Sequence, residues 1–489
     1  MLTLYTSRPL AEPAGTRLRA EPALLGLCVV AALILLGDKM LADADTHWHV
    51  AIGGQIWHDR AVPWTDVHSH TFAGDPWIAK EWLSQLLLAG AFAAAGWSGL
   101  VLITAATIGL TTAILFGWLA RRLRASFALA ATMLAICLLA PHFLARPLVF
   151  GMLALVAWTT ALVSAVERER TPPIASLIVL VLWANLHGSF TIAYPIVAVL
   201  AVEAVLDAAP GLRVSTALRW AGFGAGALLA GLATPYGIQA ALVTAALAGG
   251  GEALPFLNEW RLLEFDAAGV LAIASAAALT VGLLIASPRN VPRAIAVAAL
   301  AALSVRHSRF LDVYGLVAPI LAAGPLAKRW AELRPEATET PTGRRPAWVG
   351  VALAIAAAAA VMLTGLLRPV PSPAVTPAAA LAVARGAGLT GPVYNDYDYG
   401  GFLIAEGIPT FIDGRSDQLF LGGFISAVFA AREASGPETL LALLDRHRVS
   451  WALVKTVSSE ARFLASAPGW HLVHRDAEAA VFSRDRPIR

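Results

Sequence analysis

The chain has 489 residues, of which 58% are hydrophobic and only 14% charged, and its mean hydropathy is +0.67. A soluble protein of this size could not keep so much apolar surface away from water, so the composition predicts a polytopic membrane protein. The net charge of +3 and the pI near 9.0 do not indicate a nucleic-acid partner, because the arginines fall in short loops between apolar runs. Cys28 and Cys137 lie inside apolar runs, which predicts small core residues with no disulfide and no metal site.

Apolar runs long enough to cross a bilayer recur along the chain, and about eleven transmembrane helices are predicted. Basic residues gather in every second loop, such as Arg17 and Arg19 before the first run and Arg121 and Arg122 after the second. The positive-inside rule places these loops in the cytoplasm, so the N-terminus is predicted to be cytoplasmic and the C-terminal segment periplasmic, in a bacterial inner membrane. The runs cover roughly residues 23–41, 99–120, 126–143, 148–166, 173–187, 190–207, 218–235, 267–286, 292–305, 311–327 and 347–366.

The chain is predicted to divide into a transmembrane domain, residues 1–366, and a small extracytoplasmic α/β domain, residues 367–489. The transmembrane domain has a long first external loop at 42–98, in which residues 52–58 and 81–95 predict amphipathic helices along the bilayer surface. In the second domain, strands are predicted at 391–395, 409–414 and 449–454, and helices from Pro377 to Gly388, with Thr376 as N-cap, and from Pro437 to His447.

The segment directly after the first apolar run carries four titratable side chains, Asp43, Asp45, His47 and His49. Ionisable groups at the mouth of a membrane helix are unfavourable against lipid, so they normally face a water-filled cavity or a site. An extended segment would project all four to one side, whereas a helix would pair them at i, i+4. Either arrangement suits general-base work or a divalent cation such as Mg or Mn. The plain structural alternative is a polar helix cap beside an interfacial tryptophan.

Further charged groups fall on the same predicted face of the membrane. Lys80 and Glu81 open an apolar helix, where the helix dipole alone would favour a glutamate. Arg146 lies between two spans, and Arg306 and Arg309 form a cationic patch at an external helix end. External arginines oppose the orientation rule and are strong binders of phosphate, although they can also reach toward lipid headgroups.

Together these groups predict a reaction on a lipid-linked sugar phosphate. An anionic leaving group at the outer headgroup level would need cations to stabilise its developing charge. An acid near it would deprotonate an acceptor hydroxyl or hold a cation that bridges the phosphate. The candidate catalytic residues are Asp43, Asp45 and Glu81. The candidate phosphate-binding residues are Arg146, Arg306, Arg309, Lys80 and His187, and the candidate metal ligands are Asp43, Asp45, His47 and His49.

The motifs that carry these residues resemble an uncharacterised bacterial branch of the GT-C class of integral-membrane glycosyltransferases. That resemblance implies acidic residues in a long first external loop, a polyprenyl-phosphate sugar donor and an extracytoplasmic C-terminal domain. It does not indicate the sugar, and Asp-Ala-Asp does not decide which acid is the base. The motifs are Asp43–His49, Pro63–Asp66 with Ser69 and Thr71, Lys80–Ser84, Ala145–Pro147, Trp183–Gly188, Asn395–Gly401 and Phe411–Arg415.

The leading hypothesis is therefore a glycosyltransferase that moves a sugar from a polyprenyl phosphate to an envelope glycan, lipid or protein acceptor. A carrier or flippase for an anionic solute is the first alternative, but carriers place polar groups at mid-membrane in paired repeats, and here they concentrate at one face. A non-catalytic scaffold of a polysaccharide assembly complex is the second. For the segments Asn395–Gly401 and Ile412–Asp417, turn chemistry with an Asp–Arg pair is favoured over direct glycan contact.

Overall fold

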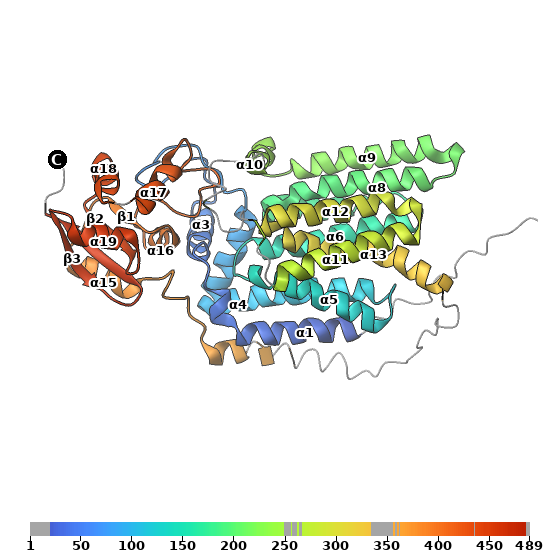
Figure 1. Cartoon of the computed structure of the whole chain (residues 1–489), viewed down its shortest axis with the longest axis horizontal. Helices are drawn as coiled ribbons and strands as arrows, with labels where there is room; N and C mark the ends of the chain where they lie inside the picture. Colours follow the sequence, from blue (N-terminus) through green and yellow to red (C-terminus); the bar gives the residue numbers. More distant parts are fainter. Residues whose placement is uncertain are drawn as a thin grey trace, which may run out of the picture.

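A computed structural model of the chain describes residues 20–248, 256, 262–263, 267–333, 356, 359–360, 362–434 and 436–485. The arginines before the first predicted span, and most of the last predicted span at 347–366, lie outside the described residues. Figure 1 shows an elongated molecule with a bundle of helices at one end, a sheet with its own helices at the other, and α3 (Thr46–Asp59) between them.

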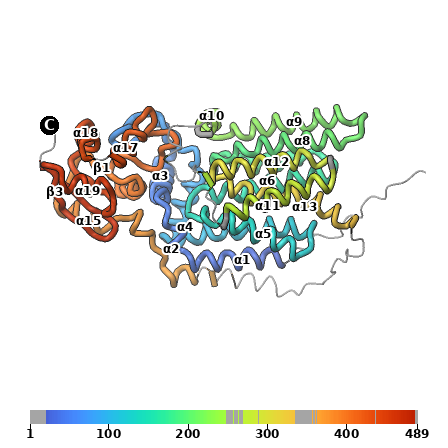
Figure 2. Tube along the Cα trace, in the orientation of Figure 1, coloured from blue at the N-terminus to red at the C-terminus, as the bar shows by residue number. Residues whose placement is uncertain are grey.

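The bundle is made of apolar helices that lie side by side (Figures 1 and 2). Six helices of the described residues are long and apolar enough to cross a membrane, and the chain is a multi-pass membrane protein. The count of eleven spans stays a prediction. The helices of this part are α1 (Ala20–Leu35), α2 (Gly37–Met40), α3 (Thr46–Asp59), α4 (Trp82–Leu119), α5 (Ala125–Leu139), α6 (Leu148–Glu167), α7 (Ser176–Leu186), α8 (Ala193–Asp207), α9 (Arg213–Gly231), α10 (Ile238–Ala248), α11 (Ala267–Ala286), α12 (Val291–Arg306) and α13 (Leu311–Leu333).

Helix α4 is two helices joined at a kink. Ala95 and Gly96 have non-helical backbone angles, and Gly96 has a φ of 57°, which glycine adopts without strain. The part before the kink packs against α3 so closely that a Cβ on Gly53 would lie 2.0 Å from the backbone oxygen of Gln85. Glycine at position 53 therefore allows α3 and the start of α4 to touch, which brings their polar ends together.

The two cysteines were predicted to be core residues, and that prediction is wrong. Cys28 in α1 and Cys137 in α5 are both exposed and form no disulfide. In a membrane helix the outward face is as apolar as the inward face, so an apolar neighbourhood in the sequence does not distinguish the two.

The C-terminal part contains a mixed four-stranded sheet in the order β1-β2-β4-β3. Strand β1 runs parallel to β2, whereas β4 is antiparallel to both of its neighbours. The stretch 409–414, predicted as a strand, makes only an isolated bridge between Ser69 and Thr410. The N-cap of α15 is Pro377 rather than Thr376. The elements are α15 (Ala378–Gly386), β1 (Val393–Asn395), α16 (Gly400–Ala405), α17 (Phe424–Glu433), α18 (Glu438–Arg446), β2 (Trp451–Lys455), α19 (Ser459–Ser466), β3 (Trp470–Arg475) and β4 (Ala479–Arg484).

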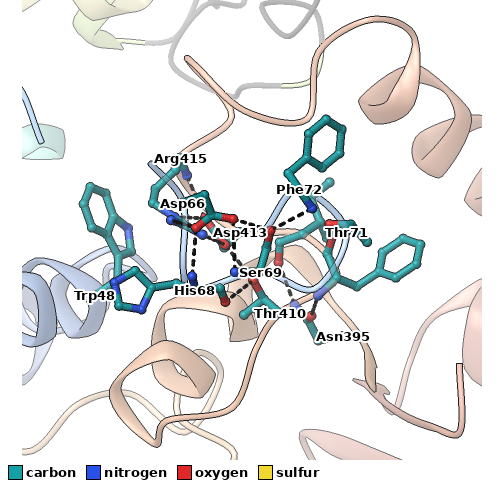
Figure 3. A network of polar contacts seen from close by, with 12 residues as sticks. Trp48, Asp66, His68, Ser69, Thr71, Phe72, Asn395, Thr410, Asp413 and Arg415 are labelled. Atoms are coloured by element: carbon teal, nitrogen blue, oxygen red, sulfur yellow. Dashed lines mark hydrogen bonds and ion pairs between the residues drawn. The ribbon is translucent and has the colours of Figure 1, made fainter. Parts of the chain in front are cut away.

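A fully buried ion network joins the loop between α3 and α4 to the C-terminal part (Figure 3). Arg415 donates from Nη1 to Asp66 at 2.5 Å, and from Nε and Nη2 to the two oxygens of Asp413 at 2.8 Å each. Asp66 also accepts the backbone N–H groups of His68 and Ser69 and the Ser69 hydroxyl. The three charged side chains have no solvent exposure, so their charges are stable only because each is paired and hydrogen-bonded.

The electrostatics of this network are set by burial and by the guanidinium. Burial by itself would raise the pKa of Asp413, but the Arg415 charge and its hydrogen bonds outweigh burial and lower that pKa. The stabilisation from a depressed carboxyl pKa is present above the unfolded value and is lost as the pH falls through the folded value. The network is therefore intact at neutral pH and is weakened only in acid.

Backbone pairing extends the same junction. Thr410 donates its N–H to His68 O and accepts from the N–H of His70, both at 2.9 Å. The Thr71 hydroxyl donates to Phe411 O at 2.8 Å. These contacts fix the loop between α3 and α4 and the C-terminal part as one unit.

Arg415→Met should destabilise the protein by about 3–5 kcal/mol, because two buried carboxylates would lose their shared cation. Unfolding of the detergent-solubilised protein, followed by tryptophan fluorescence, measures this change. Arg385→Met is the matched control, since it removes an exposed pair with Glu406 in the same part of the chain and should change stability by at most about 1 kcal/mol. Equal losses in the two variants would contradict the role given to the network.

Candidate active site between the helix bundle and the C-terminal part

A cavity of about 370 Å³ lies where the loops of the bundle meet the C-terminal part. Its wall is built from the loop before α3, the segment before α4, the turns after α5 and α7, the turn between α12 and α13, and residues 397–398 and 414–418. The predicted site residues that line it are Asp43, Asp45, His49, Lys80, Glu81, Arg146, His187 and Arg309.

The two aspartates lie in the turn that leads into α3. Oδ1 of Asp43 accepts the backbone N–H of Asp45 at 2.7 Å, and Asp45 is the N-cap residue of the helix. Oδ1 of Asp45 accepts the indole N–H of Trp48 at 2.9 Å. Asp43 is buried and Asp45 is only partly buried. The two acids lie in a turn at the start of α3, so the segment is neither wholly extended nor wholly helical.

Arg146 pairs with Asp43, its Nη1 lying 3.3 Å from Oδ2. The backbone of the preceding residue explains this position. Ala145 donates its N–H to Met40 O at 2.8 Å, and its carbonyl accepts the hydroxyl of Thr46 at 3.1 Å. The turn after α5 is therefore tied to both sides of the aspartate turn.

Lys80 is held by its backbone neighbours and by one acid. The Tyr236 hydroxyl accepts the N–H of Ala79 at 3.1 Å and donates to Pro63 O at 2.9 Å. The Lys80 ammonium forms an ion pair with Asp417 from the C-terminal part. The segment before α4 is thus fixed by Tyr236 and by Asp417, with the ammonium in the cavity wall.

Glu81 and His187 form a contact of 3.3 Å between Oε1 and Nε2. Burial raises the pKa of Glu81 against the opposing charge of Lys80, and burial lowers the pKa of His187 well below its usual value. Nδ1 of His187 accepts the N–H of Ser189 at 3.1 Å. We therefore assign the neutral tautomer with a proton on Nε2, which donates to Glu81.

Three positive side chains from three different loops, Lys80, Arg146 and Arg309, line the same cavity as His187. After burial, their charges lower the pKa of His187 further.

Arg306 does not join this group. It ends α12 in an exposed position and does not line the cavity, whereas Arg309 does. The short 3₁₀ turn Ser308–Phe310 lies between α12 and α13. The change of direction there separates two arginines that are only three positions apart.

His47 also lies elsewhere, so the four-residue acid and imidazole cluster does not form. His47 Nε2 is 2.8 Å from Thr376 Oγ1, and its ring packs edge-on against Trp97 and Phe402. Burial lowers its pKa to about 4. Two helical positions differ by roughly 200°, so His47 and His49 face opposite sides.

The four predicted metal ligands do not come together in one site. Of the four predicted ligands, His47 faces away, and Asp43 already accepts a backbone N–H and pairs with Arg146. Within the described ranges no three His, Cys, Asp or Glu side chains are grouped so that they could hold a metal ion. We derive no step through a metal.

Residues of the C-terminal part, which were expected only to form turns, also line the cavity. Tyr397 and Asp398, and the turn Gly414–Gln418, line the cavity opposite the bundle loops. Two glycines allow this close approach. A Cβ on Gly401 would lie 2.0 Å from Ala44 O, and a Cβ on Gly414 would lie 1.8 Å from Asp45 Oδ1. Gly400 and Gly401 in the first motif and Gly414 in the second were the available signal for a close backbone contact.

No family model matches this sequence, and no curated protein matches it. Solved structures match the fold. The archaeal oligosaccharyltransferase AglB from Archaeoglobus fulgidus, in complex with an inhibitory peptide and a dolichol-phosphate, gives a TM-score of 0.56 at 12% identity over 88% of this chain and 69% of AglB. The Archaeoglobus fulgidus oligosaccharyltransferase in the apo form gives 0.55 at 11% identity over 89% and 69%. ArnT from Cupriavidus metallidurans in the apo state gives 0.49 at 14% identity over 94% and 97%.

At these identities the likeness concerns the fold alone. The chain has the fold of GT-C-class integral-membrane glycosyltransferases, as the sequence motifs predicted. The roles of the individual residues are taken up below as proposals.

Gly414→Ala should destabilise the protein by about 1–3 kcal/mol, because overpacking would force the Asp45 carboxylate or the Gly414 turn to move. The unfolding midpoint in detergent measures the loss. Gly386→Ala is the control, since a Cβ there meets nothing within 4 Å in helix α15; it should be neutral or slightly stabilising. An unchanged midpoint for Gly414→Ala would mean that the turn does not press on Asp45.

Proposed function

We propose that this protein is a glycosyltransferase that moves a sugar from a polyprenyl phosphate to a hydroxyl acceptor in the cell envelope. The observation that carries the proposal is that Lys80, Arg146 and Arg309 line the same cavity as Asp43 and Asp45. A phosphate leaving group needs concentrated positive charge, and an acceptor hydroxyl needs a base. The fold, which is shared with a glycosyltransferase, supports a site that combines phosphate-binding cations with a base.

The three cations would bind the donor phosphate. Arg146 offers a planar fork of N–H donors and Lys80 a compact ammonium. Each is partly desolvated, and Arg146 and Lys80 are already balanced by Asp43 and Asp417. The anomeric C–O bond to the phosphate breaks with its electron pair on the phosphate oxygen, and these cations stabilise that charge.

Asp45 is the better candidate for the base. Asp43 is buried and pairs with Arg146, whereas Asp45 is the more exposed of the two and lies in the cavity lining at the start of α3. The more exposed carboxylate is better placed to meet an acceptor hydroxyl. The Asp45 carboxylate would take the proton of the acceptor hydroxyl as the acceptor oxygen bonds to the anomeric carbon. Asp43 would hold Arg146 in place, and Glu81 would hold His187.

Asp45→Asn should lower transfer by about 10²–10⁴-fold, since the base is lost, while the protein still folds. Purified protein given a panel of radiolabelled polyprenyl-phosphate sugars and envelope acceptors measures this. Asp59→Asn, at the exposed end of the same helix, is the control and should retain full activity. Wild-type protein that transfers no sugar from any donor would favour a carrier or a scaffold instead. Full activity in Asp45→Asn would remove Asp45 as the base.

We further propose that the cavity faces the periplasm, with the N-terminus in the cytoplasm. The support is the alternation of arginine-rich loops and the position of all cavity loops on one end of the bundle.

A reporter that is active only in the periplasm, fused after Arg489, should therefore be active. The same reporter fused within the loop after α4, at Arg122, should be silent. Activity at Arg122 and silence after Arg489 would reverse the orientation.

A further inference from the structure

We propose that Asp417 is a positioning residue that holds the Lys80 ammonium in place for the donor phosphate. This inference rests on the proposed function and names a residue on which the donor subsite depends. Asp417 comes from the C-terminal part, 337 positions away from Lys80, yet the two side chains form an ion pair in the cavity wall. Only 13% and 22% of the Lys80 and Asp417 side chains are exposed, so the pair is weakly screened by solvent.

The residue next to Asp417 holds the backbone of the same segment. Oε1 of Gln418 accepts the N–H of Ile78 at 3.2 Å, and its Nε2 donates to Ile78 O at 3.1 Å. Two successive side chains of the C-terminal part thus fix both the main chain before Lys80 and the ammonium itself.

The turn that carries Asp417 also contacts the proposed base. Gly414 lies directly against the Asp45 carboxylate, where a Cβ would be 1.8 Å from Oδ1. Arg415 locks the turn through Asp66 and Asp413. One rigid turn therefore touches the base at one end and the phosphate-binding lysine at the other, which sets the separation between them.

Positioning matters for lysine because its four-carbon stem is flexible. A free ammonium loses rotamer entropy when it binds phosphate, whereas one already held by a carboxylate has lost it before the donor arrives. Its three N–H donors allow it to keep Asp417 and still contact a phosphate oxygen. Loss of Asp417 should therefore act on the rate of transfer chiefly through Lys80.

A double-mutant cycle on the full-length protein tests this. Asp417→Asn should lower kcat by about 10- to 100-fold with a smaller change in the donor KM. In the Lys80→Met background, Asp417→Asn should cause no further loss, and Asp417→Glu should recover part of the activity. Glu406→Gln, which breaks an exposed pair with Arg385 in the same part of the chain, is the control and should be fully active. Additive losses in the cycle would overturn the proposal.

A second readout does not depend on transfer. Binding of polyprenyl monophosphate alone, followed as a shift of the unfolding midpoint, should be weakened by Lys80→Met and by Asp417→Asn, and the double variant should bind as weakly as Lys80→Met. A double variant weaker than Lys80→Met would contradict the positioning role. Wild-type protein that binds polyprenyl monophosphate but transfers no sugar would overturn the proposed function. The role of Asp417 would still be decided by comparing the midpoint shifts of the two single variants and the double variant.

Discussion

The buried pairing of Arg415 with Asp66 and Asp413 is the interaction on which the site depends. It joins a loop of the membrane part to a turn 349 positions further along the chain. A guanidinium can satisfy two carboxylates at once through its planar set of donors, which an ammonium could not do with the same geometry. Because all three charges are desolvated, the junction is rigid, and a partial separation would leave an unpaired buried charge.

The consequence of this rigidity is a cavity made by two parts of the chain. The bundle loops supply Asp45, Arg146 and Arg309, while the C-terminal turn supplies the contacts that hold Lys80 and press on Asp45. In the described cavity wall, acids and cations are paired, as in Arg146 with Asp43 and Lys80 with Asp417. A bound phosphate would meet cations that are already oriented, so little reorganisation would accompany transfer.

Much of this arrangement follows from the sequence through topology. Polar groups at alternate ends of apolar spans must lie on one face of the membrane, which is why residues as distant as Asp45, Arg146 and His187 line one cavity. The positive-inside rule predicts on which face of the membrane a loop lies, but it does not predict in which direction a side chain points. Arg306 and His47 lie near the right place in the chain and point elsewhere, because a 3₁₀ turn and the helical repeat rotate them away.

The C-terminal wall could not be predicted in the same way. The pairing of Asp66 with Arg415 and of Lys80 with Asp417 depends on contacts between distant segments, and no local pattern in either segment specifies its partner. The glycines at 401 and 414 indicated that a backbone approaches closely there, without showing what it approaches. The strands β3 and β4 were missed because their apolar residues alternate only weakly with polar ones.

The most direct test of the central claim is an experimental structure with polyprenyl monophosphate bound. The account predicts that the phosphate lies in the cavity in contact with Lys80, Arg146 and Arg309, on the side of His187, with Asp45 facing the same space. A phosphate bound beside Arg306 at the end of α12, outside the cavity, would contradict it.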